Sequence, residues 1–313
     1  MTIFKQELLK KGVIIKVNAA KIQDKTVIVT GSTFKIAQIK DDNIESCPEN
    51  PNDFIDKIKH SGLKVDIFTF MQNIPDCLPR FPYFHEQDNY AVILIDSFEQ
   101  WVKNHEVVKK SIKKSSRAEL EIKTVSFSDD LVHGIKGIFD EMPVRQGKAF
   151  WHYGKDFTTI KKEMIDRVDT SYFVGAYYRK ELIGFVKLIH FKESAYCVQI
   201  LSKVAHRDKA PNHALIAHSY KVCLEKKIKY LIYEHYEYGK KGADSLTEFK
   251  RRNGFIKMEV PRYYIPFTLK GALVLRLGMH HGFIGIIPKV LLINLLSIRT
   301  KYDEWRTRGR KEL

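Results

Sequence analysis

The sequence predicts an α/β fold of the α+β type, with a mixed, mostly antiparallel sheet flanked by helices. Short apolar runs that are typical of strands alternate with helical segments along the 313 residues. A hydrophobic content of 44% and a charged content of 29% are those of a globular protein that can build a core. The chain is long enough for two ordinary domains.

The first part of the chain is expected to contain a lead-in followed by strands and short helices. Residues up to about 24 are expected to form a short helical or loosely ordered lead-in. The apolar runs 27–29 and 34–39 flank the turn residues Thr30, Gly31 and Ser32, which predicts a hairpin. Further along, the pattern predicts a helix over 54–60, a strand over 65–70, an irregular proline-rich segment over 75–82 and a buried strand over 90–95.

The middle of the chain is expected to be richer in helices. A lysine-rich segment from 97 to about 118 predicts one helix. It is followed by an alternating strand pattern over 121–127 and by a helix from Asp129 to 139. The segment around Met142 and Pro143 breaks that helix, and another helix is expected over 159–168.

The stretch from 173 to 268 organises the rest of the chain. Three apolar runs predict strands that are followed by a helix, a fourth strand, a short helix and a last strand. The helix is expected to start within 207–215, where Pro211 is suited to a first helical turn, and to run to about 227. The predicted strands cover 173–178, 182–190, 195–201, 229–234 and the segment through 261–266.

This order of elements resembles the GNAT acyltransferase fold. The motif Phe249-Lys250-x-x-x-Gly254-Phe255, together with Arg145-Gln146-Gly147, resembles the FemAB-like branch of that superfamily. The resemblance covers roughly residues 27–299, and it implies two GNAT-like units in one chain and transfer of acyl or aminoacyl groups to amines. The units expected from it are a degenerate one over 1–110, an acyltransferase unit over 111–268 and an amphipathic, basic extension over 269–313.

The resemblance implies a donor site at the start of the helix that begins at Pro211. GNAT enzymes bind the pyrophosphate of coenzyme A there, through backbone amides of a glycine-rich turn. Arg207 matches the family pattern, whereas Ala210 and Asn212 replace its glycines. Acetyl-CoA or another acyl-CoA is therefore the expected co-substrate, and the alternative is a capped helix with solvated charges. The expected donor-binding residues are His206, Arg207, Lys209, Ala210, Asn212 and His213.

Three residues are candidates for the chemistry of acyl transfer, which needs a stabilised oxyanion and a route for the amine proton. The resemblance implies that Lys250 stabilises the oxyanion; the alternative is a basic helix face. Glu234, at a strand end, can accept the amine proton if burial raises its pKa, and otherwise it is a surface carboxylate. Tyr233 offers a general acid, although aromatic residues in strands more often belong to the core.

The acceptor is expected to bind where cations lie beside aromatic residues, a combination that suits a sugar or nucleotide-sugar phosphate. The alternative is a loop that packs its aromatic residues on the sheet. No metal site is predicted, because the adjacent His280 and His281 have no carboxylate or cysteine near them in the sequence. The candidate acceptor-binding residues are Arg145, Gln146, Trp151, His152 and Tyr153.

The sequence therefore predicts an N-acyltransferase that acts on an amine of a cell-envelope or polysaccharide precursor. A net charge of +16 favours an anionic partner, such as nucleic acid, acidic lipid or a phosphate-bearing substrate. One alternative is an aminoacyl-tRNA-dependent transferase, and another is a non-catalytic GNAT-like protein that binds a membrane or partner. Four widely spaced cysteines and a start without a secretory signal favour the cytoplasm.

The extension over 269–313 combines apolar turns with basic flanks and Trp305. Its longest uncharged run is far short of the ~20 residues of a spanning helix. Such a segment suits a helix lying on an anionic membrane surface, at the inner face of the cell membrane. The alternative is a pair of helices that packs on the protein and ends in a solvated tail.

Overall fold

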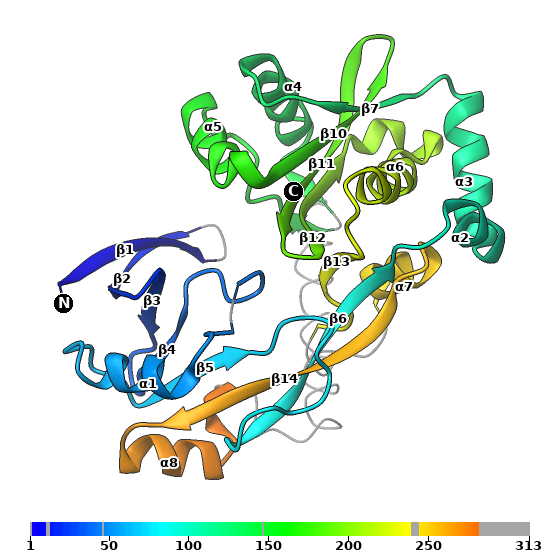
Figure 1. The fold of residues 1–313 in the computed structure, drawn as a ribbon. Coiled ribbons are helices and arrows are strands. Elements are labelled where there is room, and N and C mark those ends of the chain that lie inside the picture. The colour runs from blue at the N-terminus through cyan, green and yellow to red at the C-terminus, as the bar shows by residue number, and fades with distance from the viewer. Residues whose placement is uncertain (1, 11–12, 46, 146, 239–243, 282–313) are drawn as a thin grey trace, which may run out of the picture.

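The structure is a computed structural model that describes the chain except for residues 1, 11–12, 46, 146, 239–243 and 282–313. Twelve of the described strands form one continuous sheet, with helices on its faces (Figure 1). Two strand pairs are parallel, and the other pairs between the described strands of this sheet are antiparallel. The predicted fold class, a mixed and mostly antiparallel sheet with flanking helices, is confirmed.

The first half of the sheet begins with a hairpin that was not expected. The predicted helical or loose lead-in is wrong, because this segment forms strands β1 and β2. Apolar side chains alternate along β2, so that Val17 and Ala19 face one side and Ala20 and Ile22 the other. The half consists, in spatial order, of β1 (Ile3–Lys10), β2 (Val13–Ile22), β3 (Lys25–Thr30), β4 (Ile36–Ile39) and β5 (Ile67–Met71).

The predicted hairpin of β3 and β4 is confirmed, because these strands pair antiparallel. Helix α1 (Pro51–Lys59) begins three residues before the predicted helix and is capped by Asn50. It buries Phe54 against Phe68 of β5, with their ring centroids 5.8 Å apart. The proline-rich segment after β5 is irregular, as expected.

Strand β14 (Ile256–Pro266) joins the two halves of the sheet. It lies between β5 and β6 (His85–Leu94) and pairs antiparallel with both. The last long strand of the second predicted unit thus completes the sheet of the first (Figure 1). The boundary proposed at residue 110 stays a prediction.

The second half of the sheet holds the stretch around which the sequence is organised. Helix α6 (Pro211–Glu225) packs on one face of β11, and α4 (Asp129–Phe139) with α5 (Phe157–Ile165) packs on the other. After β6, the half consists, in spatial order, of β13 (Tyr230–His235), β12 (Ser194–Ser202), β11 (Glu181–Phe191), β10 (Ser171–Tyr178) and β7 (Glu121–Val125).

The single helix predicted over 97–118 is instead two helices, α2 (Phe98–Asn104) and α3 (Glu106–Arg117). The break falls at His105, whose backbone leaves the helical conformation, with φ of −124° and ψ of 89°. Gly254, which follows α7 (Ser245–Arg252), lies against the junction of α2 and α3. A Cβ atom at Gly254 would come within 2.7 Å of Nε2 of His105. Gly254 also has a left-handed backbone, with φ of +78°, a conformation that favours glycine at this position.

The described chain ends with α8 (Leu269–Arg276) and the short 3-10 helix η4 (Met279–His281). The rest of the predicted extension, from residue 282 onward, lies outside the described residues. Within the described part of the chain, no helix has both the length and the apolar character that a membrane span requires.

Candidate active site

The parallel strands β12 and β13 separate and leave a cavity between them. They pair only from Ser194 to Tyr196, against Tyr230 to Ile232. Beyond that point a cavity of about 570 Å³ opens between β12, β13, the start of α6, α7 and the hairpin of β8 (Val144–Arg145) and β9 (Lys148–Ala149). Five of the predicted site residues line it: Arg145, Trp151, Arg207, Asn212 and Tyr233.

Lys250 lies next to this cavity, on α7, and its side chain is fully buried. Its Nζ donates a hydrogen bond to the carbonyl oxygen of His235 at 2.5 Å and one to the hydroxyl of Tyr238 at 3.4 Å. The same Nζ lies 4.5 Å from the ring centroid of Tyr233, a residue of the cavity wall. Burial lowers the pKa of Lys250 to about 8, although the charge of Glu234 opposes this shift.

A second buried lysine shows what is distinctive about Lys250. Burial also lowers the pKa of Lys187, on β11, to about 8. Its Nζ donates to the carbonyl oxygens of Glu163 at 3.4 Å, Met164 at 2.9 Å and Asp166 at 2.6 Å. An ammonium group has three N–H donors, so Lys187 is saturated. Lys250 has two acceptors among the described residues, which leaves one N–H for another oxygen.

The end of β13 carries Tyr233 and Glu234. Burial raises the pKa of Tyr233, so its hydroxyl stays protonated at neutral pH and can donate a hydrogen bond. Glu234 has a left-handed backbone, with φ of +46°, at an irregularity in the pairing of β13 with β6. Its side chain is exposed and accepts a hydrogen bond from the hydroxyl of Tyr238 at 2.5 Å. The burial on which its role as proton acceptor was predicted to depend is therefore absent.

The start of α6 is the segment at which a donor site was predicted, and it lacks the glycines of the family pattern. Ala210 takes the left-handed conformation, with φ of +56°, and Pro211 opens the helix. No side chain caps this end, so the first amides of the helix are open to a ligand. Arg207 is exposed on the cavity wall, and the Oδ1 atom of Asn212 is buried without a hydrogen-bond partner among the described residues.

The other predicted donor residues are engaged with the protein. The ring of His206 packs at a tilt against Tyr178, with their ring centroids 5.5 Å apart, and Lys209 pairs with Asp208 at 3.0 Å. His213 donates from Nδ1 to Oδ1 of Asn253 at 2.9 Å, and burial lowers its pKa. These three residues therefore shape the turn, while Arg207 and Asn212 face the cavity.

Arg145 organises the wall of the cavity. Its guanidinium group donates to the carbonyl oxygens of Ser202 at 3.0 Å and Ile138 at 2.7 Å, and to Glu141 at 3.2 Å. The carboxylate of Glu141 in turn accepts hydrogen bonds from the amides of Val204 at 2.7 Å and Ala205 at 2.8 Å. These amides begin the 3-10 helix η2 (Val204–Lys209), which carries Arg207. Glu141 was not predicted, although its spacing of four from Arg145 was a usable signal.

The predicted aromatic acceptor residues are only partly brought to the cavity. Trp151 is half exposed on the wall, with Nζ of Lys155 over its ring at 4.0 Å. His152 is buried against Phe139, and burial lowers its pKa to about 3. Tyr153 is exposed and does not belong to the described wall. Gln146 lies outside the described residues.

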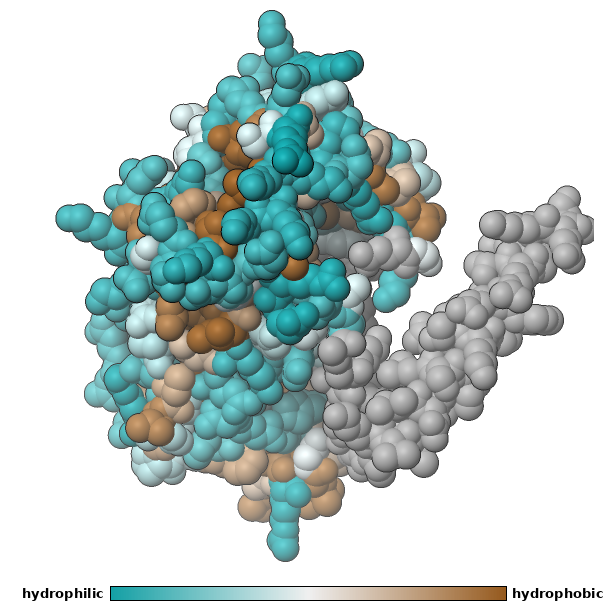
Figure 2. All heavy atoms as spheres, turned by 90° about the vertical axis from the view of Figure 1, so that its right-hand side faces the viewer, coloured by the Kyte–Doolittle hydropathy of each residue, from teal (hydrophilic) through white to brown (hydrophobic). Residues whose placement is uncertain are grey.

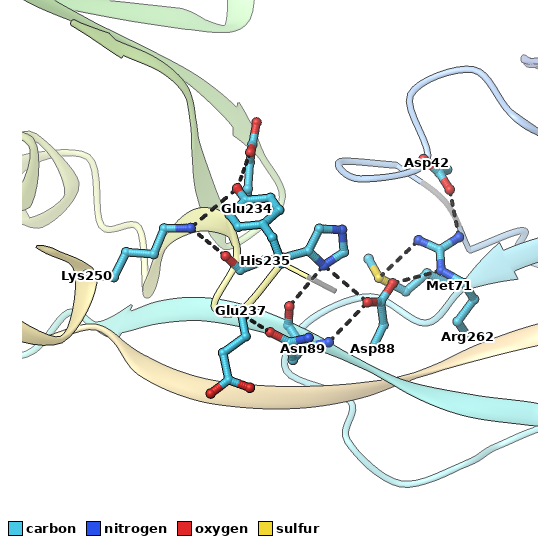
Figure 3. Close-up of polar contacts among 10 residues, drawn as sticks. Asp42, Met71, Asp88, Asn89, Glu234, His235, Glu237, Lys250 and Arg262 are labelled. Atoms are coloured by element: carbon cyan, nitrogen blue, oxygen red, sulfur yellow. Dashed lines mark hydrogen bonds and ion pairs between the residues drawn. The ribbon is translucent and has the colours of Figure 1, made fainter. Parts of the chain in front are cut away.

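A network of charges, which the sequence did not reveal, supports the site from the other side (Figure 3). The imidazole of His235 lies 3.1 Å from Asp88, and Arg262 bridges Asp88 at 2.8 Å and Asp42 at 2.7 Å. Burial would raise the pKa of Asp88, but His235 and Arg262 hold it at about 2. Asp42 and Arg262 are 220 positions apart in the chain, so no local pattern connects them.

The sequence has no carboxylate near His280 and His281, but the fold brings one to them. Glu86 of β6 lies within 3.1 Å of both histidines. The sequence could not reveal this, because 194 positions separate Glu86 from His280.

Comparison with known proteins bears on the fold. No protein-family model matches the sequence, and no curated protein matches it significantly. Solved structures match over most of the chain. FemX has a TM-score of 0.55 at 9% identity, covering 88% of this chain and 90% of its own. L-PGS from Bacillus licheniformis has a TM-score of 0.55 at 13% identity, covering 83% and 88%.

The C-terminal domain of a putative lysylphosphatidylglycerol synthetase from Agrobacterium fabrum is similar as well. Its TM-score is 0.53 at 12% identity, covering 87% of each chain. At such identities the similarity concerns the fold. The chain therefore shares the fold of FemX and of these two structures, in agreement with the FemAB-like order of strands and helices in its sequence.

Proposed function

We propose that this protein is an N-acyltransferase, which moves an acyl group from a carrier to an amine in the cavity between β12 and β13. The observation that carries the proposal is Lys250, a buried ammonium with one N–H free of described partners, next to the cavity wall. A buried charge that is not fully hydrogen-bonded is costly, so its presence here favours a functional role.

In the proposed reaction the amine nitrogen attacks the acyl carbonyl carbon. The new C–N bond forms and gives a tetrahedral oxyanion. Collapse of the oxyanion breaks the bond to the carrier, which leaves as a thiolate and takes a proton from water. Lys250 donates its third N–H to this oxyanion, and Tyr233 holds the acyl group against the wall. Tyr238 contacts both Lys250 and Glu234, and it offers the amine proton a path to the exposed carboxylate.

The proposed donor is acetyl-CoA or another acyl-CoA. Arg207 and the uncapped start of α6 provide a cation and open amides for its phosphates. Trp151 and the neighbouring aromatic residues then offer a surface to the acceptor, an amine of a cell-envelope or polysaccharide precursor. Arg145 acts as a positioning residue, because its donors are directed at the protein.

Substitution of the two buried lysines tests this proposal. Lys250→Ala should abolish acyl transfer from acyl-CoA to a panel of amines, measured as release of free thiol, while the donor still binds. Lys187→Met changes a buried lysine outside the cavity. The fraction of this variant that folds should transfer acyl groups at a rate within a few-fold of that of the unaltered protein. Full biological function of the Lys250→Ala protein would favour the non-catalytic alternative.

A second candidate donor is an aminoacyl-tRNA. The net charge of +16 and the exposed lysines of α3 favour a polyanion. In that case charged tRNA should bind with an affinity that falls steeply with salt, and acyl-CoA should not compete with it. The lysines concerned are Lys109, Lys110, Lys113 and Lys114.

The acceptor can also be presented at a membrane, because α8 exposes an apolar face. Leu269, Leu273 and Leu277 are spaced by four and are 92%, 57% and 53% exposed. Figure 2 shows a mostly hydrophilic surface with a hydrophobic patch at its lower end, where Figure 1 places α8. Leu273→Glu should weaken co-sedimentation with anionic phosphatidylglycerol vesicles, and Leu78→Glu, at an exposed leucine elsewhere, should not.

A further inference from the structure

A second cavity lies in the other half of the molecule and ends in a cluster of metal-ligating side chains. This cavity has a volume of about 430 Å³ and is bordered by β6, β14 and η4. Nε2 of His280 lies 3.1 Å from Oε1 of Glu86, and Nε2 of His281 lies 2.5 Å from Oε2 of the same residue. One ligand atom from each of the three residues can be chosen within 4.8 Å of the others.

These residues are of types that bind transition-metal ions, and the 3.1 Å between Nε2 of His280 and Oε1 of Glu86 is close to the separation of two ligands around such an ion. The 2.5 Å contact of His281 with Glu86 is a hydrogen bond that an ion would replace. Zinc lies about 2.0–2.2 Å from imidazole nitrogen and carboxylate oxygen, so ligands at tetrahedral corners lie about 3.3 Å apart. Two histidines and one glutamate, with the fourth corner open, form a ligand set that zinc uses in proteins. The ring of His280 is held in place by Tyr264, with ring centroids 4.6 Å apart.

The charges around the cavity favour a cation. Three carboxylates line it, those of Asp42, Glu86 and Asp88, against one guanidinium group, that of Arg262. Arg262 bonds to Asp42 and Asp88, which leaves Glu86 with the two histidines.

We propose that Glu86, His280 and His281 bind one divalent transition-metal ion of the Zn²⁺ class, with an open coordination position toward this cavity. Such an ion holds η4 against β6, two elements that are distant in the chain. It also offers a Lewis acid to an oxygen atom of a ligand in the cavity. This inference is independent of the proposed acyl transfer.

Direct metal binding by the full chain tests the inference. After removal of metals by chelation, Co²⁺ should bind one per chain and give the visible absorption of a low-coordinate site, and Zn²⁺ should displace it. Glu86→Gln and His281→Ala should each weaken the affinity for Zn²⁺ at least tenfold, as measured by isothermal titration. His281 is half exposed, so the His281→Ala protein should fold. It therefore tests the inference even if the Glu86→Gln protein does not fold.

Two control variants exclude binding elsewhere. His60→Ala removes an exposed histidine, and Cys77→Ser removes the exposed thiol. Both should keep the affinity and the absorption of the unaltered protein. The inference is overturned if no metal binds, or if Glu86→Gln and His281→Ala bind as the unaltered protein does, since the three residues would then form only a hydrogen-bonded cluster.

Discussion

The carbonyl oxygen of His235 accepts a hydrogen bond from Nζ of Lys250, at 2.5 Å, on the side of the cavity. The imidazole of the same residue bonds to Asp88 on the other side, at 3.1 Å. Figure 3 shows the resulting chain of contacts from Lys250 through His235 and Asp88 to Arg262. The end of β13, where the strand leaves β12, is therefore fixed from both sides.

The pKa of Lys250 should govern the alkaline side of the pH–rate profile. Only the protonated amine can donate to the oxyanion, so kcat should fall as the pH rises through about 8. In Lys250→Arg the guanidinium stays charged, and any remaining activity should lose this descending limb. Steady-state rates across the pH range provide the measurement. A descending limb that persists unchanged in the arginine variant contradicts the assignment.

Removal of Arg262 should destabilise the fold. Arg262→Met leaves the carboxylate of Asp42 without its cation and that of Asp88 with His235 alone, and loss of one partner of a buried pair costs about 3–5 kcal/mol. Urea unfolding measures this change. As the control, Arg251→Met removes an exposed cation paired with Glu248, which should cost about 1 kcal/mol or less. Equal losses in the two variants would show that the buried network does not hold the sheet together.

The pair of Asp88 and His235 should make stability depend on pH in two directions. The pKa of Asp88 is about 2, so its contribution to the free energy of unfolding is lost as the pH falls below 4 toward 2. Burial lowers the pKa of His235 but Asp88 raises it above 6.5 overall, so its contribution is present below 6.5 and is lost as the pH rises through the folded-state pKa.

Asp88→Asn should therefore cost most stability between about pH 4 and pH 6.5 and less in alkaline solution. Urea unfolding at several pH values gives the comparison. Part of the loss should not depend on pH, because Arg262 also loses a partner. A loss of the same size at every pH would mean that His235 is not charged in the folded protein.

Glu141 should influence donor binding from outside the cavity. Glu141→Gln weakens the contacts to the amides of Val204 and Ala205 and to Arg145, and it should raise the Kd for acyl-CoA about tenfold. Glu181→Gln is the matched control, because Glu181 pairs with Lys203, next to η2, on the surface. Donor titrations of the two variants measure the effect. The same Kd for acyl-CoA in both variants would contradict a role of Glu141 in donor binding.

The fold could be predicted because its second half carries strong local signals. The apolar runs of β10, β11 and β12 and the start of α6 lie close to the predicted positions. The hairpin of β1 and β2 was not predicted, because the interpretation of this segment as a helical lead-in overlooked a short alternation of apolar residues around Val17 and Ala19. The break at His105 was not predicted either, since the segment from 97 to 118 contains no proline or glycine that would interrupt a helix.

Residues of the candidate site could be predicted from the sequence where they match a local motif. They could not be predicted where their partners are distant in the chain and meet them only in the folded protein. Lys250 and Arg207 were predicted because each matches a pattern of the family that the sequence resembles, and the structure places Arg207 on the cavity wall and Lys250 next to it. Asp88 and Glu86 were not found, since their partners follow more than 140 residues later in the chain. Glu234 was interpreted correctly as a strand end, but its exposure depends on how β13 leaves the sheet.

The most direct test of the central claim is isothermal titration of the purified protein with acetyl-CoA and longer acyl-CoAs. The account predicts saturable binding that weakens in Arg207→Ala and is unchanged in Arg117→Ala, an exposed arginine of α3. Absence of binding to every acyl-CoA would contradict an acyl-CoA donor in the cavity between β12 and β13. Charged tRNA would then be the donor to titrate next.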